Sequence, residues 1–242
     1  MKDLPKVLLL DLDDTILDWY SDPDEAWLQL CREFAGSLGD VPAEGLQAAV
    51  LQARDWFWSD EERARRGRLD LRLARRYILL RAFARFDIPD SLLLTRMGER
   101  YNHIRDEAMR PFPGAIESLQ RLRMANIRLG LITNGSAEGQ RAKIERFSLA
   151  GYFDHIQIEG EFGIGKPDAR AFRHALDALG VAPAEAWMVG DNLEYDIHGA
   201  QQVGIYAVWI DAGGSGLPDG STVRPDRIIR SLSDLVKASI LD

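Results

Sequence analysis

Four short segments of the 242-residue chain carry side chains that could do chemistry. In the first, residues 11–15 (DLDDT), the carboxylates of Asp11 and Asp13 are spaced by two and follow an apolar run. A carboxylate at such a position can act as a nucleophile or metal ligand, and its neighbour can move a proton. An Asp and a Thr that merely cap the following turn would give the same pattern, so this segment alone leaves both interpretations open.

The second and third segments carry groups that suit a phosphate. Residues 131–135 (LITNG) place the hydroxyl of Thr133 and the amide of Asn134 after another apolar run. Together with free backbone N–H groups, they could bind phosphoryl oxygens, although an ordinary helix cap is the alternative. Residues 165–168 (GKPD) contain Lys166, which could neutralise a developing negative charge or could be a surface lysine.

The fourth segment, residues 189–196 (VGDNLEYD), is acidic. Asp191 lies at the end of an apolar run, and Asp196 follows five residues later near the predicted start of a helix. Converging carboxylates suit Mg²⁺, a hard cation that takes oxygen ligands. The alternative is an Asp that caps the helix, with acidic residues favoured by the helix dipole.

The apolar runs before these segments predict the strands that would position them. Runs of this length that are rich in Val, Ile and Leu are typical of strands buried on both faces. Helical patterns between the strands, over 115–125 and 168–179, predict an α/β fold with a Rossmann-like parallel sheet and right-handed crossovers. In such sheets ligands bind beyond the carboxyl ends of the strands, where the polar segments lie. The predicted strands cover residues 7–10, 127–132, 186–189 and 205–210, with a weaker candidate at 155–158.

One long stretch departs from this alternation. Between about Ile16 and Met109 we expect no strand, and the helical patterns are interrupted by proline or glycine. The sequence therefore predicts two domains, an α/β core formed by residues 1–16 and 110–242 and an inserted helical domain formed by 17–109. The helices expected in the insertion cover 23–36, 43–59, 69–86 and 91–107.

The four segments together resemble the motifs of the haloacid dehalogenase-like hydrolase superfamily. The DxDxT, hydrophobic-Thr-Asn, Gly-Lys-Pro and Gly-Asp-x-x-x-x-Asp motifs occur in that order between Asp11 and Asp196. The resemblance implies that Asp11 is the nucleophile that forms an aspartyl-phosphate. It also implies that Asp13 is the general acid–base, which protonates the leaving alcohol and then activates water.

The resemblance also assigns the remaining residues. Thr133 and the backbone of Asn134 would hold the phosphoryl oxygens, and Lys166 would pair with the nucleophile and the phosphate. Mg²⁺ would be held by Asp11, by the backbone carbonyl of Asp13 and by the Asp191 carboxylate. Two supporting residues complete the set: Asp196 would support the Mg²⁺ site either from behind its direct ligands or through a water molecule, and Thr15 would help to order the first loop.

The implied function is a Mg²⁺-dependent hydrolase of phosphomonoesters that acts on a small phosphorylated metabolite, either a nucleotide or a sugar phosphate. The motifs are similar to those of pyrimidine 5′-nucleotidases and N-acylneuraminate-9-phosphatases, and the insertion resembles the helical cap of such enzymes. Asp13 disfavours dehalogenation, and residues 17–110 contain no lysine for the Schiff base of a phosphonate-cleaving relative. A phosphomutase of the same superfamily remains an alternative, as does a non-catalytic phosphate-binding or signalling protein.

The composition of the chain limits the kinds of partner and metal site that we expect. The net charge of −8 argues against nucleic-acid binding through bulk charge, and the lone Cys31 excludes an internal disulfide and a cysteine-built zinc site. We expect a cytoplasmic protein without a targeting or membrane segment, and we assign no oligomeric state. Residues 56–58 (WFW), which precede an arginine-rich run, could stack on a substrate or could pack between helices.

Overall fold

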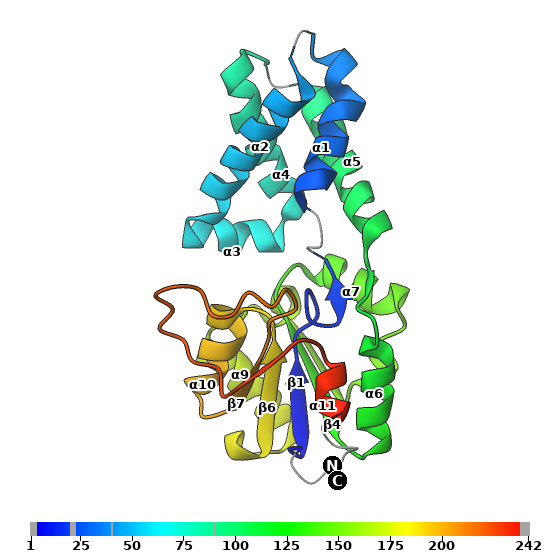
Figure 1. Cartoon of the computed structure of the whole chain (residues 1–242), viewed down its shortest axis with the longest axis vertical. Coiled ribbons are helices and arrows are strands. Elements are labelled where there is room, and N and C mark those ends of the chain that lie inside the picture. The colour runs from blue at the N-terminus through cyan, green and yellow to red at the C-terminus, as the bar shows by residue number, and fades with distance from the viewer. Residues whose placement is uncertain (1–3, 20–22, 40, 90, 238–242) are drawn as a thin grey trace. The chain divides into compact units, whose positions relative to one another are not determined.

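The computed structural model describes residues 4–19, 23–39, 41–89 and 91–237. The chain divides into two compact units, one formed by Met1–Asp18 with Arg110–Asp242 and the other by Trp19–Met109 (Figure 1). The first unit holds the motif residues and contains the sheet. Within the described residues, no helix is both long and apolar enough to cross a membrane.

The first unit is built on a six-stranded sheet in the order β5-β4-β1-β6-β7-β8, and every neighbouring pair is parallel. All four residues of β1 are buried, which explains why this strand reads as a continuous apolar run. The predicted α/β fold with a parallel sheet is therefore confirmed. The strands are β1 (Val7–Leu10), β4 (Arg128–Thr133), β5 (His155–Ile158), β6 (Ala186–Gly190), β7 (Tyr206–Ile210) and β8 (Arg227–Ile229).

Helices connect these strands and bury their apolar faces against the sheet. Phe172, Ala175 and Leu176 of α9 pack in one core with residues of β1, β4, β6 and β7. Asp168 caps the start of α9, and Gly180 ends it in the left-handed conformation that a glycine tolerates best. The helices of this unit are α6 (Ala115–Met124), α7 (Ala137–Arg146), α8 (Glu159–Phe162), α9 (Ala169–Leu179), α10 (Gly199–Gln201) and α11 (Ser233–Lys237), and a π-helical segment covers Leu193–His198.

Three short strands were not expected from the sequence. β8 has only three residues, and β2 (Leu17–Asp18) pairs antiparallel with β3 (Arg110–Pro111). The expectation of no strand between Ile16 and Met109 is therefore wrong at β2, because a two-residue strand is too short to show any periodicity. Leu17 and Asp18 belong to the first unit, although we assigned them to the insertion, because they pair with residues that follow it.

The second unit is a bundle of helices around an apolar core that includes Trp27, Leu30 and Phe83. Trp27 stacks on Tyr101 with ring centroids 3.6 Å apart. Asp70 ends α3 and caps α4, so the helix expected over 69–86 begins at Leu71, and the arginine-rich run before it forms a helix of its own. The helices are α1 (Pro23–Phe34), α2 (Ala43–Trp58), α3 (Glu61–Leu69), α4 (Leu71–Phe83) and α5 (Leu92–Ala108).

The aromatic residues at the end of α2 make contacts within their own unit. Phe57 is 5% exposed and packs in the helical core. The centroid of the Trp56 ring lies 4.2 Å from the guanidinium carbon of Arg63 and 4.0 Å from that of Arg81. Helix packing and cation–π contacts therefore account for both side chains in this structure.

Candidate active site

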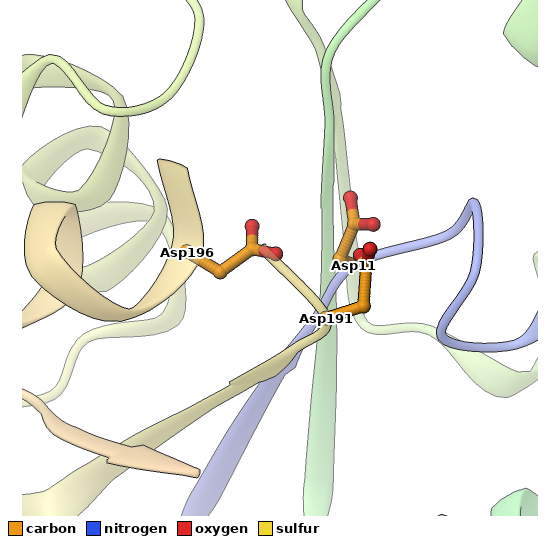
Figure 2. Close-up of side chains that lie close together, drawn as sticks. All are labelled: Asp11, Asp191 and Asp196. Carbon is orange, nitrogen blue, oxygen red and sulfur yellow. The ribbon is translucent and has the colours of Figure 1, made fainter. Parts of the chain in front are cut away.

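The parallel sheet brings three carboxylates together at the carboxyl ends of neighbouring strands. Asp11 follows β1, Asp191 follows β6, and Asp196 lies in the π-helical segment that comes next. Because Leu10 pairs with Val189, the residues after the two strands emerge at the same edge. One carboxylate oxygen from each of the three residues lies within 4.8 Å of the others, and Figure 2 shows the carboxyl group of Asp196 reaching toward Asp11 and Asp191.

Lys166 is buried among these carboxylates. Its Nζ lies 2.5 Å from Asp11 Oδ1 and 2.6 Å from Asp196 Oδ1, and the side chain is 3% exposed. Burial lowers the pKa of Lys166, but Asp11 and Asp196 outweigh burial and hold the pKa above its usual value. The alternative of an exposed surface lysine is therefore wrong.

The cluster has more negative than positive groups. Burial raises the pKa of Asp11 to about 7, with Asp196 adding to the rise and Lys166 opposing it. Burial also raises the pKa of Asp191 to about 9, helped by Asp196 and Asp11. Two buried carboxylates and the half-buried Asp191 beside one ammonium carry uncompensated charge when all are ionised. This all-oxygen set fits Mg²⁺, which would supply the missing positive charge.

The three carboxylates that lie close together differ in one member from the predicted metal ligands Asp11, Asp13 and Asp191. The Asp13 carboxylate contacts Lys143 Nζ at 2.8 and 2.7 Å instead, and the carboxylate that joins the group is that of Asp196. Asp13 was assigned to the metal through its backbone carbonyl, and that assignment stays a prediction. Asp196 pairs directly with Lys166 and accepts a hydrogen bond from the Asn192 backbone N–H at 3.0 Å. Its carboxylate therefore lies closer to those of Asp11 and Asp191 than we expected of a supporting residue.

Thr133 and Asn134 lie at the end of β4, beside β1. Thr133 Oγ1 accepts a hydrogen bond from Gln140 Nε2 at 2.5 Å. The Asn134 side chain holds the backbone of Lys166 at both ends: it donates to the carbonyl at 2.7 Å and accepts from the N–H at 2.8 Å. This reciprocal pair fixes the loop that carries Lys166. The predicted contact of both residues with phosphoryl oxygens stays a prediction.

Two glycines let side chains of the site approach the backbone closely. A Cβ on Gly190 would overlap the carboxyl group of Asp196, which folds back over the end of β6. A Cβ on Gly165 would lie 2.8 Å from Asn134 Oδ1. Both positions therefore require glycine for a steric reason. The Gly-Asp and Gly-Lys pairs of the sequence owe their first residue to this packing.

Sequence reasoning missed three polar residues of the site. Gln140 and Lys143 lie on α7, and both are buried. Glu159 at the start of α8 is also buried, and its Oε2 accepts from the Gly135 N–H at 3.1 Å. Two buried polar residues three positions apart on one helix face are a signal that could have been found only with α7 placed. Thr15 is 2% exposed, and its hydroxyl makes no hydrogen bond with the described residues, so its ordering role stays a prediction.

Comparisons with known proteins agree with this geometry. A family model described as haloacid dehalogenase-like hydrolase matches residues 5–204. Phosphoserine phosphatase of Thermus thermophilus is 43% identical over 130 residues, 54% of this chain and 51% of the relative. Glyceraldehyde 3-phosphate phosphatase of Methanopyrus kandleri is 29% identical over 243 residues, 96% of this chain and 99% of the relative. The chain thus spans about half of the first relative and nearly all of the second.

A relative of the branch named from the sequence also matches. N-acylneuraminate-9-phosphatase of Rattus norvegicus is 43% identical over 110 residues, 45% of this chain and 44% of the relative. Among solved structures, the HAD-hydrolase YfnB of Bacillus subtilis, bound to magnesium, aligns with a TM-score of 0.75 at 20% identity. That alignment covers 98% of this chain and 99% of YfnB. At this identity it shows a shared fold.

Proposed function

Because the chain belongs to the haloacid dehalogenase-like hydrolase family, we propose that it is a Mg²⁺-dependent phosphomonoester hydrolase that works through an aspartyl-phosphate on Asp11. The family and the phosphatase branch predicted from the sequence are confirmed by the matches. One observation carries the proposal. The Asp11 carboxylate is buried 2.5 Å from Lys166 Nζ, inside a group of carboxylates that one lysine cannot neutralise.

The residues of the chain would share the chemistry as follows. A carboxylate oxygen of Asp11 attacks phosphorus while the bond from phosphorus to the alcohol oxygen breaks. Asp13, which enters this step after taking up a proton from solvent, gives that proton to the departing alcohol. Asp13 then takes a proton from water, which attacks the same phosphorus and releases phosphate and the Asp11 carboxylate. Lys166 and Thr133 would hold the phosphoryl oxygens. Lys166 remains charged throughout, since the pKa of its ammonium is raised.

Mg²⁺ would be held by Asp11, Asp191 and the Asp13 carbonyl, with Asp196 beside them. When bound, it would offset the repulsion between the Asp11 carboxylate and a phosphate dianion. A carboxylate cannot approach a dianion in a buried site without such compensation. Lys166 alone supplies one positive charge against the carboxylates that surround it.

The substrate proposed is a small phosphorylated metabolite, a nucleotide or a sugar phosphate. Relatives are named for phosphoserine, glyceraldehyde 3-phosphate and N-acylneuraminate 9-phosphate, so the alcohol part varies within the family. The helical unit Trp19–Met109 would act as the cap that selects it. The lone cysteine, Cys31, favours a cytoplasmic location.

Phosphate release from a panel of esters tests the proposal. Nucleoside monophosphates, sugar phosphates and an aryl phosphate are assayed with Mg²⁺ and with chelator. Asp11→Asn is compared with Asp177→Asn, a matched change at an exposed position of α9. We expect Mg²⁺-dependent release that Asp11→Asn abolishes and Asp177→Asn leaves intact. Transfer of phosphate to a second position of the same metabolite would indicate a mutase, and binding without turnover would indicate a phosphate-binding protein.

A further inference from the structure

We propose that Gln140 and Lys143 are positioning residues, which set the Asp13 carboxylate and the Thr133 hydroxyl for proton transfer and phosphate binding. Both residues lie on α7, the helix that follows Thr133 in the chain. The inference rests on the proposed function, which gives Asp13 and Thr133 their roles. Gln140 and Lys143 lie outside the four motif segments, so the sequence motifs give neither residue a role.

Lys143 fixes the Asp13 carboxylate through both of its oxygens. The ammonium nitrogen lies 2.8 Å from Oδ1 and 2.7 Å from Oδ2. The lysine side chain is 10% exposed and that of Asp13 is 22% exposed, so water competes little for these bonds on the lysine side. A carboxylate bound through both oxygens cannot rotate freely about its Cβ–Cγ bond.

Gln140 joins Asp13 to Thr133. Its Nε2 lies 3.0 Å from Asp13 Oδ2 and 2.5 Å from Thr133 Oγ1, and the residue is 3% exposed. The orientation of the amide follows from chemistry, since an ionised carboxylate only accepts hydrogen bonds and the NH₂ end must face it. One N–H of the Gln140 amide then donates to Asp13 and the other donates to Thr133.

This arrangement decides what the Thr133 hydroxyl can do. Because its oxygen accepts from Gln140, its proton must point elsewhere. Within the described residues, that hydroxyl donates only to the Asn134 carbonyl, at 3.5 Å, which is a long and weak contact. The hydroxyl is therefore prepared as a donor for a phosphoryl oxygen, at little cost in lost hydrogen bonding.

The same helix thus orients the residue that would bind phosphate and the residue that would protonate the leaving group. A displacement of about 1 Å at a reacting group can cost on the order of 10² in rate. If Lys143 only stabilised the fold, its loss would slow all esters alike. If it positions the acid, its loss slows esters of poor leaving groups selectively, because aryl oxyanions depart without a proton.

The first experiment compares kcat/KM for an alkyl phosphate and p-nitrophenyl phosphate, both with Mg²⁺. For Lys143→Met we expect a loss on the order of 10² on the alkyl ester and under about tenfold on the aryl ester. Lys143→Arg should recover part of the alkyl activity. The matched control is Arg141→Met on the same helix, where Arg141 pairs with Glu161 at the surface, and it should change neither value. Equal losses on both esters in Lys143→Met would overturn the role assigned to Lys143.

The second experiment needs no turnover. Calorimetry measures the Kd of inorganic phosphate with Mg²⁺ for wild type, Gln140→Leu and Arg141→Met. We expect Gln140→Leu to weaken binding about fivefold or more, the worth of one oriented hydrogen bond, and Arg141→Met to bind like wild type. An unchanged Kd in Gln140→Leu would overturn the role assigned to Gln140. Because binding is measured directly, this result stands even where wild type hydrolyses no ester, the outcome that would overturn the proposed function instead.

Discussion

Two lysines contact aspartates at the same edge of the sheet, and their surroundings differ in charge. Lys166 Nζ lies within 2.6 Å of oxygens from both Asp11 and Asp196, with the Asp191 carboxylate in the same group. Lys143 Nζ contacts both oxygens of the Asp13 carboxylate, and the neutral amide of Gln140 lies beside the same carboxylate. In the first cluster three carboxylates gather around one ammonium, whereas in the second one ammonium contacts both oxygens of one carboxylate.

The difference separates two uses of a lysine–carboxylate pair. A buried excess of negative charge attracts a cation and raises the pKa values of its carboxyl groups, as seen for Asp11 and Asp191. A balanced and partly exposed pair has no such demand, and it serves to hold one carboxylate in place. The excess of carboxylates around Lys166 therefore indicates where the proposed Mg²⁺ would bind, and the two contacts of Lys143 indicate that the orientation of the Asp13 carboxylate is fixed.

The largest difference is expected when each lysine is replaced by methionine. Lys166→Met leaves buried carboxylates without their ammonium, and losing one partner of a buried ion pair typically costs about 3–5 kcal/mol. Lys143→Met loses charged hydrogen bonds at a more exposed pair, for which about 1–3 kcal/mol is typical. Urea unfolding at pH 8 in chelator measures both free energies. Equal losses would contradict the distinction between the clusters.

A smaller effect is expected from pH and Mg²⁺ together. Between pH 4 and 9 the raised pKa values of Asp11 and Asp191 mean that the folded protein holds more protons than the unfolded chain. Without metal, the free energy of unfolding should therefore fall as pH rises from about 4, with the decline due to Asp11 ending near 7 and that due to Asp191 ending near 9. Saturating Mg²⁺, which in the proposed function would bind the ionised carboxylates, should flatten this decline.

Asp191→Asn provides the control for this prediction. The amide removes one of the competing carboxylates, so the metal-free variant should be more stable than wild type at pH 8. It should also lose most of its response to Mg²⁺. Thermal unfolding across pH 5 to 9, with Mg²⁺ and with chelator, gives all four curves. A variant that is less stable than wild type in chelator at pH 8 would show that burial of the Asp191 carboxylate and its repulsion by Asp196 and Asp11 do not destabilise the metal-free protein.

The sequence identifies the residues of the first cluster, around Lys166, better than those of the second, around Lys143. Asp11, Thr133 and Asp191 follow apolar runs, and parallel pairing forces the ends of such strands to one edge. Gln140 and Lys143 come from the body of a helix, where the sequence does not say which face meets the site. A lysine in the middle of a helix resembles any solvent-exposed lysine until the helix is placed against β4 and the first loop.

The elements that the sequence does not predict lack a local signal. Long apolar runs predict β1, β4, β6 and β7 because burial on both faces leaves a strong signal. The pairing of Leu17 with Pro111 and of Asp18 with Arg110 joins residues more than ninety positions apart, and neither pair has an apolar pattern. Such pairings form because the ends of the helical insertion must meet. They depend on the tertiary structure and not on local composition.

The smallest effect on the binding of Mg²⁺ is expected from the loss of a hydrogen bond to the backbone of Asp191, one of its proposed ligands. Trp209 Nε1 donates to the Asp191 carbonyl at 2.6 Å, from the neighbouring strand β7. Trp209→Phe removes this hydrogen bond, worth about 1 kcal/mol, and lets the Asp191 backbone move, so the Kd for Mg²⁺ should rise about fivefold. Trp187→Phe, near the opposite end of β6, loses part of its stacking with Tyr206 and should leave that Kd unchanged. Calorimetric titration of Mg²⁺ measures both. Because the excess of carboxylates is untouched by either change, a loss of binding much larger than fivefold in Trp209→Phe would mean that backbone geometry, rather than charge, dominates the affinity of this site.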